Sequence, residues 1–359
     1  MHLNLHKKAY KKVLLIANGY EPYHDDISHL AESVHYIDPY SQDKNYIQSL
    51  ETFKKYLEDN NLDSKSTKII YGSGLEDKIG IQEYLDNEFS IAGNSFSKYR
   101  YLSNIYNLDE AIFNKKISLP ETSKSYHYKF LSKKYNSSGG LHVGNNIFSK
   151  NIYYQKYLPG KTYSISFIAN GEYSKILGLN QLFLVKDNIK FPFLHSGAMN
   201  LGLSEANIDF PKNFISSICN LYQIKGYCSI DFKILDNKIY ILDFNPRLSS
   251  SYRLYTRKYK NLMHHHLGLI DNELNMISNQ YYAYIILYAK KDLVISDSIN
   301  ELENISDRPT IGDSIKKDMP LFTINLYSND KDDILFKIKN RIISAMKIID
   351  CYNTQLEYE

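Results

Sequence analysis

The stretch that most constrains how this chain can fold lies between residues 226 and 247, GYCSIDFKILDNKIYILDFNPR. Two segments rich in β-branched and aromatic residues, YCSIDF and IYIL, flank the dipeptide Asp236-Asn237. Such segments are typical of strands, and Asp and Asn tolerate the left-handed backbone that a tight hairpin turn needs. We therefore predict an antiparallel hairpin in this stretch.

The hairpin would bring three oxygen-bearing side chains to one place. Asp231 ends the first segment, and Asp243 and Asn245 follow the second. Residues two apart on a strand point to the same face, so Asp243 and Asn245 share one. Carboxylate and amide oxygens suit Mg²⁺ held against phosphates better than zinc or iron. The sequence thus predicts a metal site; the alternative is a solvated hairpin whose polar residues lie on its outer face.

The segment from Asp231 to Arg247 resembles the metal-binding end of ATP-grasp ligases, in which a DF dipeptide and a turn precede E-x-N-P-R. In this chain Asp243 stands where the family usually has Glu, and its shorter side chain favours a single Mg²⁺ over two bridged ions. Three more segments agree with the family in the same order, at residues 133–140, 154–160 and 178–181.

Two segments outside that core, residues 71–76 and 92–94, resemble one subgroup of the superfamily. These are the predicted ATP-dependent carboligases related to biotin carboxylase. They occur in methanogens and methylotrophs and include the tyramine-glutamate ligase of methanofuran synthesis. The resemblance runs from about residue 11 to about residue 345, which is most of the chain.

The N-terminal part predicts a parallel sheet with crossover helices, because apolar runs at 13–19, 34–38 and 68–72 alternate with helical segments. Together with the resemblance, this gives an α/β (α+β) chain with the ATP-grasp fold. Residues 162–169 alternate small polar with apolar residues, which predicts a half-buried strand. The expected parts are an N-terminal α/β domain at 1–97, a lid subdomain at 98–155, a core with an antiparallel sheet and the metal hairpin at 156–255, and a C-terminal β-rich region with a helix at 256–359.

A loop of small residues follows Lys133 and consists of Ser137, Ser138, Gly139 and Gly140. Small residues expose backbone N–H groups, and a concave array of such groups accepts phosphate oxygens. The alternative is a flexible connection. The resemblance implies that Lys133 and this loop bind the phosphates of ATP. Lys134 replaces the proline that is usual in the family, which leaves open which lysine contacts phosphate.

The resemblance implies that main-chain groups of the hinge between lid and core bind the adenine of ATP. The residues carried over are Gln155, Lys156 and Leu158. Two further segments, at residues 180–181 and 195–197, resemble positions that line the pocket of the second substrate, although exposed loop residues would look the same.

The reaction implied by the resemblance is an ATP-dependent ligation of a carboxylic acid to an amine, with Mg²⁺ or Mn²⁺. Lys133 would stabilise the phosphates, and Arg247 would hold the carboxylate or its acyl phosphate. The subgroup suggests small-molecule substrates, glutamate among them, and a step in making a one-carbon carrier of the methanofuran, methylofuran or tetrahydromethanopterin type. Two alternatives stay open: a carboxylase that phosphorylates bicarbonate, and a nucleotide-binding module without catalysis.

Charge and composition argue against several other classes of protein. The formal net charge is +3, with basic and acidic residues interspersed, so we expect neither a nucleic-acid nor a membrane partner. Three cysteines without a C-x-x-C pair argue against a zinc ribbon and a disulfide framework. There is no apolar run of membrane-spanning length and no signal-peptide pattern, so we expect a cytoplasmic protein. A homodimer is left open.

The run His264-His265-His266 invites a metal hypothesis. On a helix, however, successive residues point about 100° apart, and only residues three or four apart share a face. We therefore expect at least one of the three to be buried and the others to be solvated.

Overall fold

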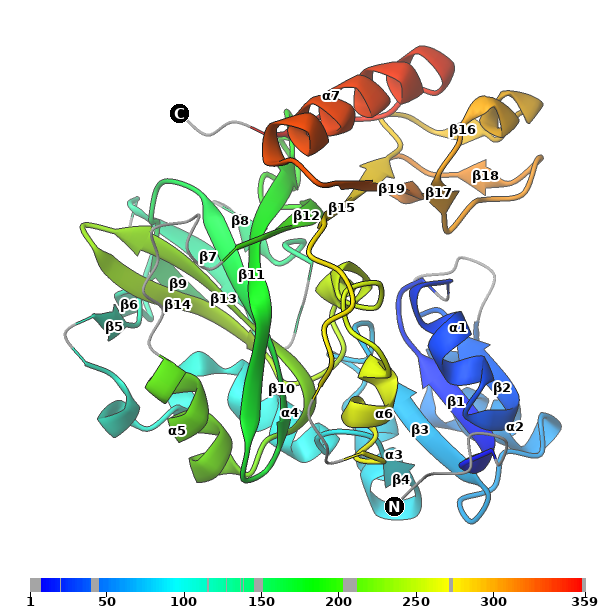
Figure 1. Cartoon of the computed structure of the whole chain (residues 1–359), viewed down its shortest axis with the longest axis vertical. Helices are drawn as coiled ribbons and strands as arrows, with labels where there is room; N and C mark the ends of the chain where they lie inside the picture. Colours follow the sequence, from blue (N-terminus) through cyan, green and yellow to red (C-terminus); the bar gives the residue numbers. More distant parts are fainter. Residues whose placement is uncertain are drawn as a thin grey trace.

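The N-terminal sheet lies beside a longer central sheet in the computed structural model (Figure 1). The residues that the structure describes are 8–19, 21–39, 45–114, 116–126, 128–135, 137, 139–144, 151–202, 212–270 and 274–356. They form four sheets, of which two are large enough to organise the chain. A third, at residues 122–156, lies almost wholly within the predicted lid, and we call it the lid.

The N-terminal sheet has the strand order β2-β1-β3-β4, and all its strand pairs are parallel. Alternate residues of its central strand pack in opposite directions: Val13 and Leu15 against α1, and Leu14 and Ile16 against α2 and α3. This confirms the predicted parallel sheet with crossover helices. The elements are β1 Tyr10–Ile16, α1 Glu21–Ser28, β2 Ala31–Ile37, η1 Asn45–Ile47, α2 Leu50–Asp59, β3 Thr67–Tyr71, α3 Ile79–Glu88, β4 Ser90–Ile91 and α4 Phe96–Ser103.

The central sheet has the order β17-β19-β15-β12-β11-β10-β13-β14-β5, with β20 paired to β11. Its pairs are antiparallel except for β14 and β5, which run parallel. The C-terminal strands therefore continue the sheet that carries the predicted metal hairpin. The strands are β5 Ile117–Ser118, β10 Thr162–Asn170, β11 Ser174–Val185, β12 His195–Leu201, β13 Lys225–Leu235, β14 Lys238–Asn245, β15 Tyr281–Tyr288, β17 Ile305–Ser306, β19 Pro320–Ser328 and β20 Thr354–Gln355.

Both faces of the central sheet are covered. On one face, Ile165 and Phe167 of β10 belong to a core shared with α5 (Lys212–Tyr222) and α7 (Lys331–Ile348). On the other, Ile168 belongs to a core shared with η4 (Ser250–Leu254) and the N-terminal sheet. Residues 164–169 are consequently all buried, so the prediction of a half-buried strand is wrong. Of the small polar side chains of β10, Ser166 takes part in a buried hydrogen-bond network, whereas Thr162 and Ser164 line a cavity.

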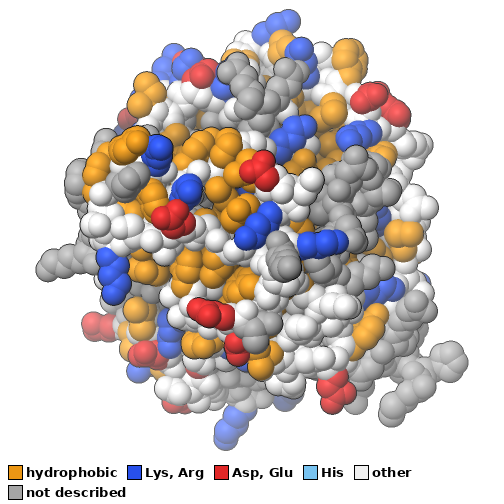
Figure 2. All heavy atoms as spheres, turned by 90° about the vertical axis from the view of Figure 1, so that its left-hand side faces the viewer, with side chains coloured by type: hydrophobic (Ala, Val, Ile, Leu, Met, Phe, Trp, Pro, Cys, Tyr) orange, Lys and Arg blue, Asp and Glu red, His pale blue; other side chains and the backbone are white. Residues whose placement is uncertain are grey.

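The lid is a separate sheet with the order β6-β9-β7-β8, and residues 157–161 connect its strand β9 to β10 of the central sheet. Its strands are β6 Thr122–Ser123, β7 Phe130–Lys134, β8 Val143–Gly144 and β9 Ile152–Lys156. Hydrophobic side chains gather in the middle of the face on which β5, β6 and β9 lie, among scattered lysines, arginines and carboxylates (Figure 2). The short helices η2 Ile105–Asn107 and η3 Glu110–Ile112 lie between α4 and β5 in the sequence.

The C-terminal residues contain strands and a helix, as the sequence predicts for 256–359; the longest of these elements include β15 and α7. A small hairpin of β16 (Leu293–Val294) and β18 (Ser314–Ile315) and the short helix η5 (Asp297–Glu301) lie between them in the sequence. In the described part of the chain, no helix combines the length and the apolarity needed to cross a membrane.

The histidine run lies on the short helix α6, Leu262–His266. His266 is buried, and its Nδ1 accepts a hydrogen bond of 2.9 Å from the backbone N–H of Tyr227. Burial lowers the pKa of His266 to about 3, so the ring is neutral. His264 and His265 are half-buried. The run is therefore a packing element, and no group of three His, Cys, Asp or Glu residues among the described residues could hold a metal ion.

Candidate functional site

A cavity of about 510 Å³ lies where the central sheet, the lid and two loops of the N-terminal sheet meet. Each of these parts supplies polar residues to the cavity wall. The metal hairpin and the residues just after it supply Asp231, Lys233, Asp243, Asn245 and Arg247; the lid supplies Lys133; the N-terminal loops supply Asn18 and Ser73. The three predicted metal ligands and both predicted catalytic residues thus line one space.

The metal hairpin forms as predicted from β13 and β14. Asp236 and Asn237 turn the chain with positive φ angles of 51° and 59°, the backbone of a type I′ turn. The register then shifts between Phe232 and Asp231, so that Asp231 lies opposite Asp243 and Ser229 lies opposite Asn245. These four facing residues line the cavity, so the alternative of a solvated hairpin with its polar residues on the outer face can be set aside.

The two facing carboxylates are in electrostatic conflict. Burial, and then the charge of the nearby Asp243, raise the pKa of Asp231 to about 7, although a hydrogen bond with Ser164 on β10 acts in the opposite direction. Burial also raises the pKa of Asp243, against the effect of Lys133 and Arg247. Two carboxylates so close cannot both ionise easily without a cation between them. Together with the amide oxygen of Asn245, they fit a hard divalent cation such as Mg²⁺.

Lys133 is the lysine that enters this space. It lies on β7 of the lid, is buried, and donates a hydrogen bond of 3.1 Å from Nζ to the carbonyl oxygen of Leu242 on β14. Lys134 is half-buried and lines a smaller adjoining pocket instead. The lid cation therefore reaches the strand that carries Asp243 and Asn245.

The small-residue loop lies against the central sheet. Gly139 and Gly140 line the cavity, Ser137 lines the adjoining pocket, and Ser138 lies outside the described residues. The carbonyl oxygen of Gly139 accepts a hydrogen bond of 3.0 Å from the backbone N–H of His195. A Cβ at Gly140 would lie 1.7 Å from the carbonyl oxygen of Phe193, so only glycine allows this approach.

The hinge residues Gln155, Lys156 and Leu158 also line the cavity. Gln155 is buried and donates from Nε2 to the hydroxyl of Tyr106 at 2.8 Å. The backbone N–H of Lys156 donates to the carbonyl of Glu121, and its ammonium pairs with the same residue at 3.2 Å. The N–H of Lys156 is therefore engaged within the lid.

Lys233 is a site residue that the sequence interpretation missed. Its Nζ donates to the carbonyl oxygens of Leu158 at 2.7 Å and Gly160 at 2.8 Å, so it ties the hinge to β13. Burial lowers the pKa of Lys233 to about 8. The available signal was its position two residues after Asp231, which places both side chains on the same face of the strand.

Arg247 is buried in the cavity wall, and its Nη2 lies 2.9 Å from Oε1 of Glu76. Its Nη1 donates to the carbonyl oxygen of Leu248 at 2.9 Å. Because Glu76 follows β3, this ion pair connects the end of the metal hairpin to the N-terminal sheet.

The structure places the two segments that resemble pocket-lining positions, residues 180–181 and 195–197, in different surroundings. His195 lines the cavity, and its Nε2 lies 2.9 Å from the hydroxyl of Tyr284. Burial, and then the charge of Arg253, lower the pKa of His195 to about 4, so it is neutral. Asn180 is instead buried in β11, where it bonds to Ser166 and Tyr255.

Replacing Asp231 with Asn tests the charge conflict without nucleotide. Because the folded-state pKa of Asp231 is raised, its contribution to stability is present below about pH 4 and is lost as the pH rises through about 7. We therefore expect Asp231→Asn to raise the melting temperature of the metal-free protein at pH 8 by about 2 °C or more. The gain should shrink toward pH 5.

Differential scanning fluorimetry with EDTA or with millimolar Mg²⁺ checks this expectation. Mg²⁺ should stabilise the unmodified protein more than Asp231→Asn. The matched control is Asp236→Asn in the turn of the same hairpin, which should behave as the unmodified protein does. Equal melting temperatures of all three proteins at pH 8 in EDTA would contradict the conflict.

Residues 102–251 match the family model of the ATP-grasp domain. An uncharacterized protein of Methanocaldococcus jannaschii is 27% identical over 272 residues, and the match covers 68% of this chain and 66% of that protein's length.

Solved structures with a similar fold span nearly the whole chain. A biotin carboxylase from Campylobacter jejuni, in a β-γ-ATP complex, has a TM-score of 0.67 at 11% identity and covers 96% of this chain and 93% of that one. An L-amino acid ligase from Bacillus licheniformis has a TM-score of 0.62 at 11% identity, covering 92% and 97%. The biotin carboxylase domain of the 2-oxoglutarate carboxylase of Hydrogenobacter thermophilus, with MgADP and bicarbonate, has a TM-score of 0.64 at 10% identity, covering 97% and 92%. The chain therefore has the ATP-grasp fold, and its residues 102–251 are similar to the ATP-grasp domain.

Proposed function

We propose that this protein is an ATP-dependent ligase that joins a carboxylic acid to an amine through an acyl phosphate. The observation that carries the proposal is the facing pair Asp231 and Asp243, with Asn245, in one cavity with the buried cations of Lys133 and Arg247. The two cations, together with a divalent metal ion held by the carboxylates, suit a ligand that carries several negative charges, such as a nucleotide triphosphate.

In this proposal the nucleotide base lies at the hinge and the phosphates lie at the metal hairpin. Apolar side chains of Leu131, Leu158 and Leu184 line the cavity and suit the base. Lys233 holds the hinge carbonyls in place. A Mg²⁺ ion held by Asp231, Asp243 and Asn245 would neutralise phosphate charge and polarise the γ-phosphoryl group.

The protein's own residues then position the reactants. Lys133 contacts the phosphates, and Arg247 holds the acid. A carboxylate oxygen attacks the γ-phosphorus and the bond to ADP breaks; the amine nitrogen then attacks the acyl carbon, phosphate leaves, and the amine loses a proton. The backbone of Gly139 and Gly140, packed against Phe193 and His195, excludes water from the acyl phosphate.

The substrates proposed are small molecules, and glutamate is one candidate acid. The resemblance of residues 71–76 and 92–94 to the methanogen and methylotroph subgroup supports a step in making a one-carbon carrier cofactor. Ser73, within that resemblance, and Asn18 line the cavity on the side of the N-terminal sheet. Both carry neutral polar side chains that suit orientation of a polar substrate.

Lys233→Met tests the role of the hinge cation. Hydrogen bonds from a charged donor are worth about 1.5–3 kcal/mol each, so losing two should weaken the hold on the hinge carbonyls. We expect MgATP affinity, measured by calorimetry, to fall about tenfold or more. Lys238→Met, near the turn of the same hairpin, is the control. Wild-type affinity in Lys233→Met would remove this residue from nucleotide binding.

A pair of glycine variants tests the closed loop. Gly139 and Gly140 both have positive φ, 69° and 78°, so alanine strains both to a similar degree. Only the Cβ at Gly140 meets backbone, whereas nothing lies within 4 Å of the one at Gly139. We expect Gly140→Ala to reduce nucleotide-dependent protection of the loop in hydrogen exchange far more than Gly139→Ala. Equal protection in both variants would show that the loop does not close on Phe193.

Product analysis tests the reaction class. With a productive acid and amine, ADP and phosphate should form in step with amide, and hydroxylamine should trap the acyl phosphate as a hydroxamate. Arg247→Ala should lower turnover more than MgATP affinity, because its proposed partner is the reacting acyl group. ADP formation that depends on bicarbonate and not on an amine would favour a carboxylase instead. MgATP binding without ADP formation for any pair of amino acids, aromatic amines and pterin or furan precursors would favour a binding module.

A further inference from the structure

The buried ion pair of Glu76 and Arg247 joins residues from two sheets. The two residues are 171 positions apart in the sequence, and their side chains are 7% and 4% exposed. Glu76 follows β3 of the N-terminal sheet, whereas Arg247 follows β14 of the central sheet. A cavity-lining guanidinium is thus paired with a carboxylate from another part of the fold.

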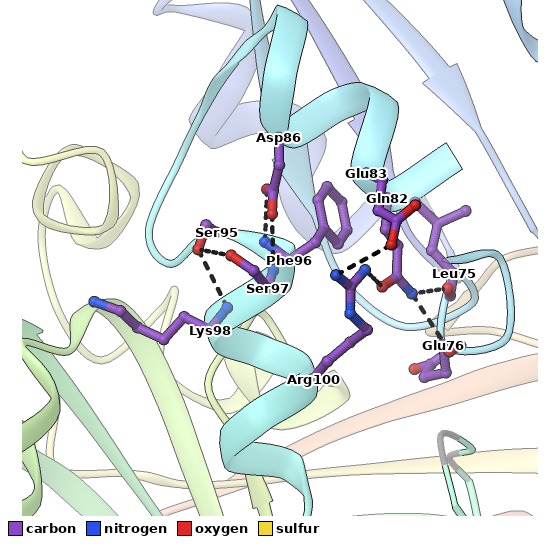
Figure 3. A network of polar contacts seen from close by, with 10 residues as sticks. All are labelled: Leu75, Glu76, Gln82, Glu83, Asp86, Ser95, Phe96, Ser97, Lys98 and Arg100. Carbon is purple, nitrogen blue, oxygen red and sulfur yellow. Dashed lines mark hydrogen bonds and ion pairs between the residues drawn. The ribbon is translucent and has the colours of Figure 1, made fainter. Parts of the chain in front are cut away.

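The loop that carries Glu76 is itself held by hydrogen bonds. Oε2 of Glu76 accepts a hydrogen bond of 2.6 Å from the backbone N–H of Gly74. Nε2 of the buried Gln82 on α3 donates to the carbonyl oxygens of Leu75 and, at 3.3 Å, Glu76. Figure 3 shows Gln82 between this loop and Arg100 of α4, whose Nη1 donates to Oε1 of Gln82 at 2.9 Å. Both the carboxylate and the backbone of Glu76 are therefore fixed.

Helix α4 is fixed in turn at its N-terminus. The carboxylate of Asp86 on α3 accepts hydrogen bonds from the backbone N–H groups of Phe96 at 2.7 Å and Ser97 at 2.8 Å (Figure 3). This places a negative charge at the positive end of the helix dipole. The same helix carries Tyr99, whose ring centroid is 5.6 Å from the guanidinium carbon of Arg247. Helix α4 therefore contacts Arg247 directly and, through Arg100 and Gln82, also supports its partner.

Stability alone is a weak reason for such a pair. Burying two charges costs solvation, and replacement of buried ion pairs by apolar residues is often neutral or stabilising. A fixed guanidinium plane, in contrast, is what two-point binding of a carboxylate or phosphate requires. Glu76 and the carbonyl of Leu248 hold one atom each, Nη2 and Nη1, which defines that plane.

We propose that Glu76 is a positioning residue that orients the Arg247 guanidinium toward the acyl group in the cavity. This inference rests on the proposed function. It makes the N-terminal sheet part of the machinery of the reaction, through a residue that does not touch the substrate.

Glu76→Gln tests the proposal because it keeps the shape of the side chain and removes its charge. The control is Glu83→Gln on α3, whose exposed carboxylate lies 3.8 Å from Arg100 and does not contact Arg247. We expect Glu76→Gln to lower kcat by about 10- to 100-fold, the range found when residues that orient catalytic ligands are replaced. MgATP affinity should stay unchanged, and Glu83→Gln should match the unmodified protein in both measurements.

A double-mutant cycle separates positioning from general support. In an Arg247→Ala background, Glu76→Gln should cause no further loss of kcat, because its effect passes through Arg247. An equal fall in both backgrounds, or a normal kcat in Glu76→Gln, would overturn the proposal. So would a parallel loss of MgATP affinity, which indicates that the cavity as a whole has loosened.

A second measurement does not depend on the reaction. The side-chain Nε–H signal of Arg247 in nuclear magnetic resonance, assigned by its loss in Arg247→Lys, should shift or broaden in Glu76→Gln and not in Glu83→Gln. An unchanged signal in Glu76→Gln overturns the positioning role. If no acid and amine pair yields ADP in the unmodified protein while this signal responds as expected, the proposed function fails and the orientation of Arg247 by Glu76 stands.

Discussion

The electrostatic repulsion between the facing carboxylates of Asp231 and Asp243 is the constraint on which the rest of the site depends. The hairpin register places them opposite each other in the wall of the cavity, where both are half-buried, so each raises the cost of ionising the other. Cations must come close for both to be charged. The chain supplies Lys133 from the lid and Arg247 from the end of the hairpin, and a divalent ion completes the balance in the proposed reaction. The charge state of each carboxylate therefore depends on the cations around it.

This constraint explains why the cavity forms at a junction of three parts of the fold. The hairpin alone would leave its carboxylates in water with ordinary acidity. The lid brings Lys133 onto β14, and the loop after β3 brings Glu76 onto Arg247. In the central sheet, the buried hydroxyls of Tyr227, Ser166 and Ser251 bond to one another and so satisfy their own hydrogen-bonding groups.

The sequence predicted which helices and strands form better than it predicted what packs around them. The parallel sheet, the hairpin and the C-terminal helix follow from apolar periodicity and turn residues, and the structure has all three. The strand at 162–169 was expected to be half-buried because its small polar residues alternate with apolar ones. They are buried because the N-terminal sheet and η4 cover that face, which no local pattern records. Lys233 was missed for the same reason, since its partners lie in the hinge.

Residues 226–247 by themselves determined the core of the candidate site. Alternation along the strand places Asp243 and Asn245 on one face, and a register shift within the hairpin, between Asp231 and Phe232, brings Asp231 opposite Asp243. Only the tertiary structure decided which groups meet them. Lys133 reaches the carbonyl of Leu242 across 109 residues, and Glu76 reaches Arg247 across 171. Local propensities act over a few residues, whereas these contacts depend on how the lid and the N-terminal sheet pack against the central sheet.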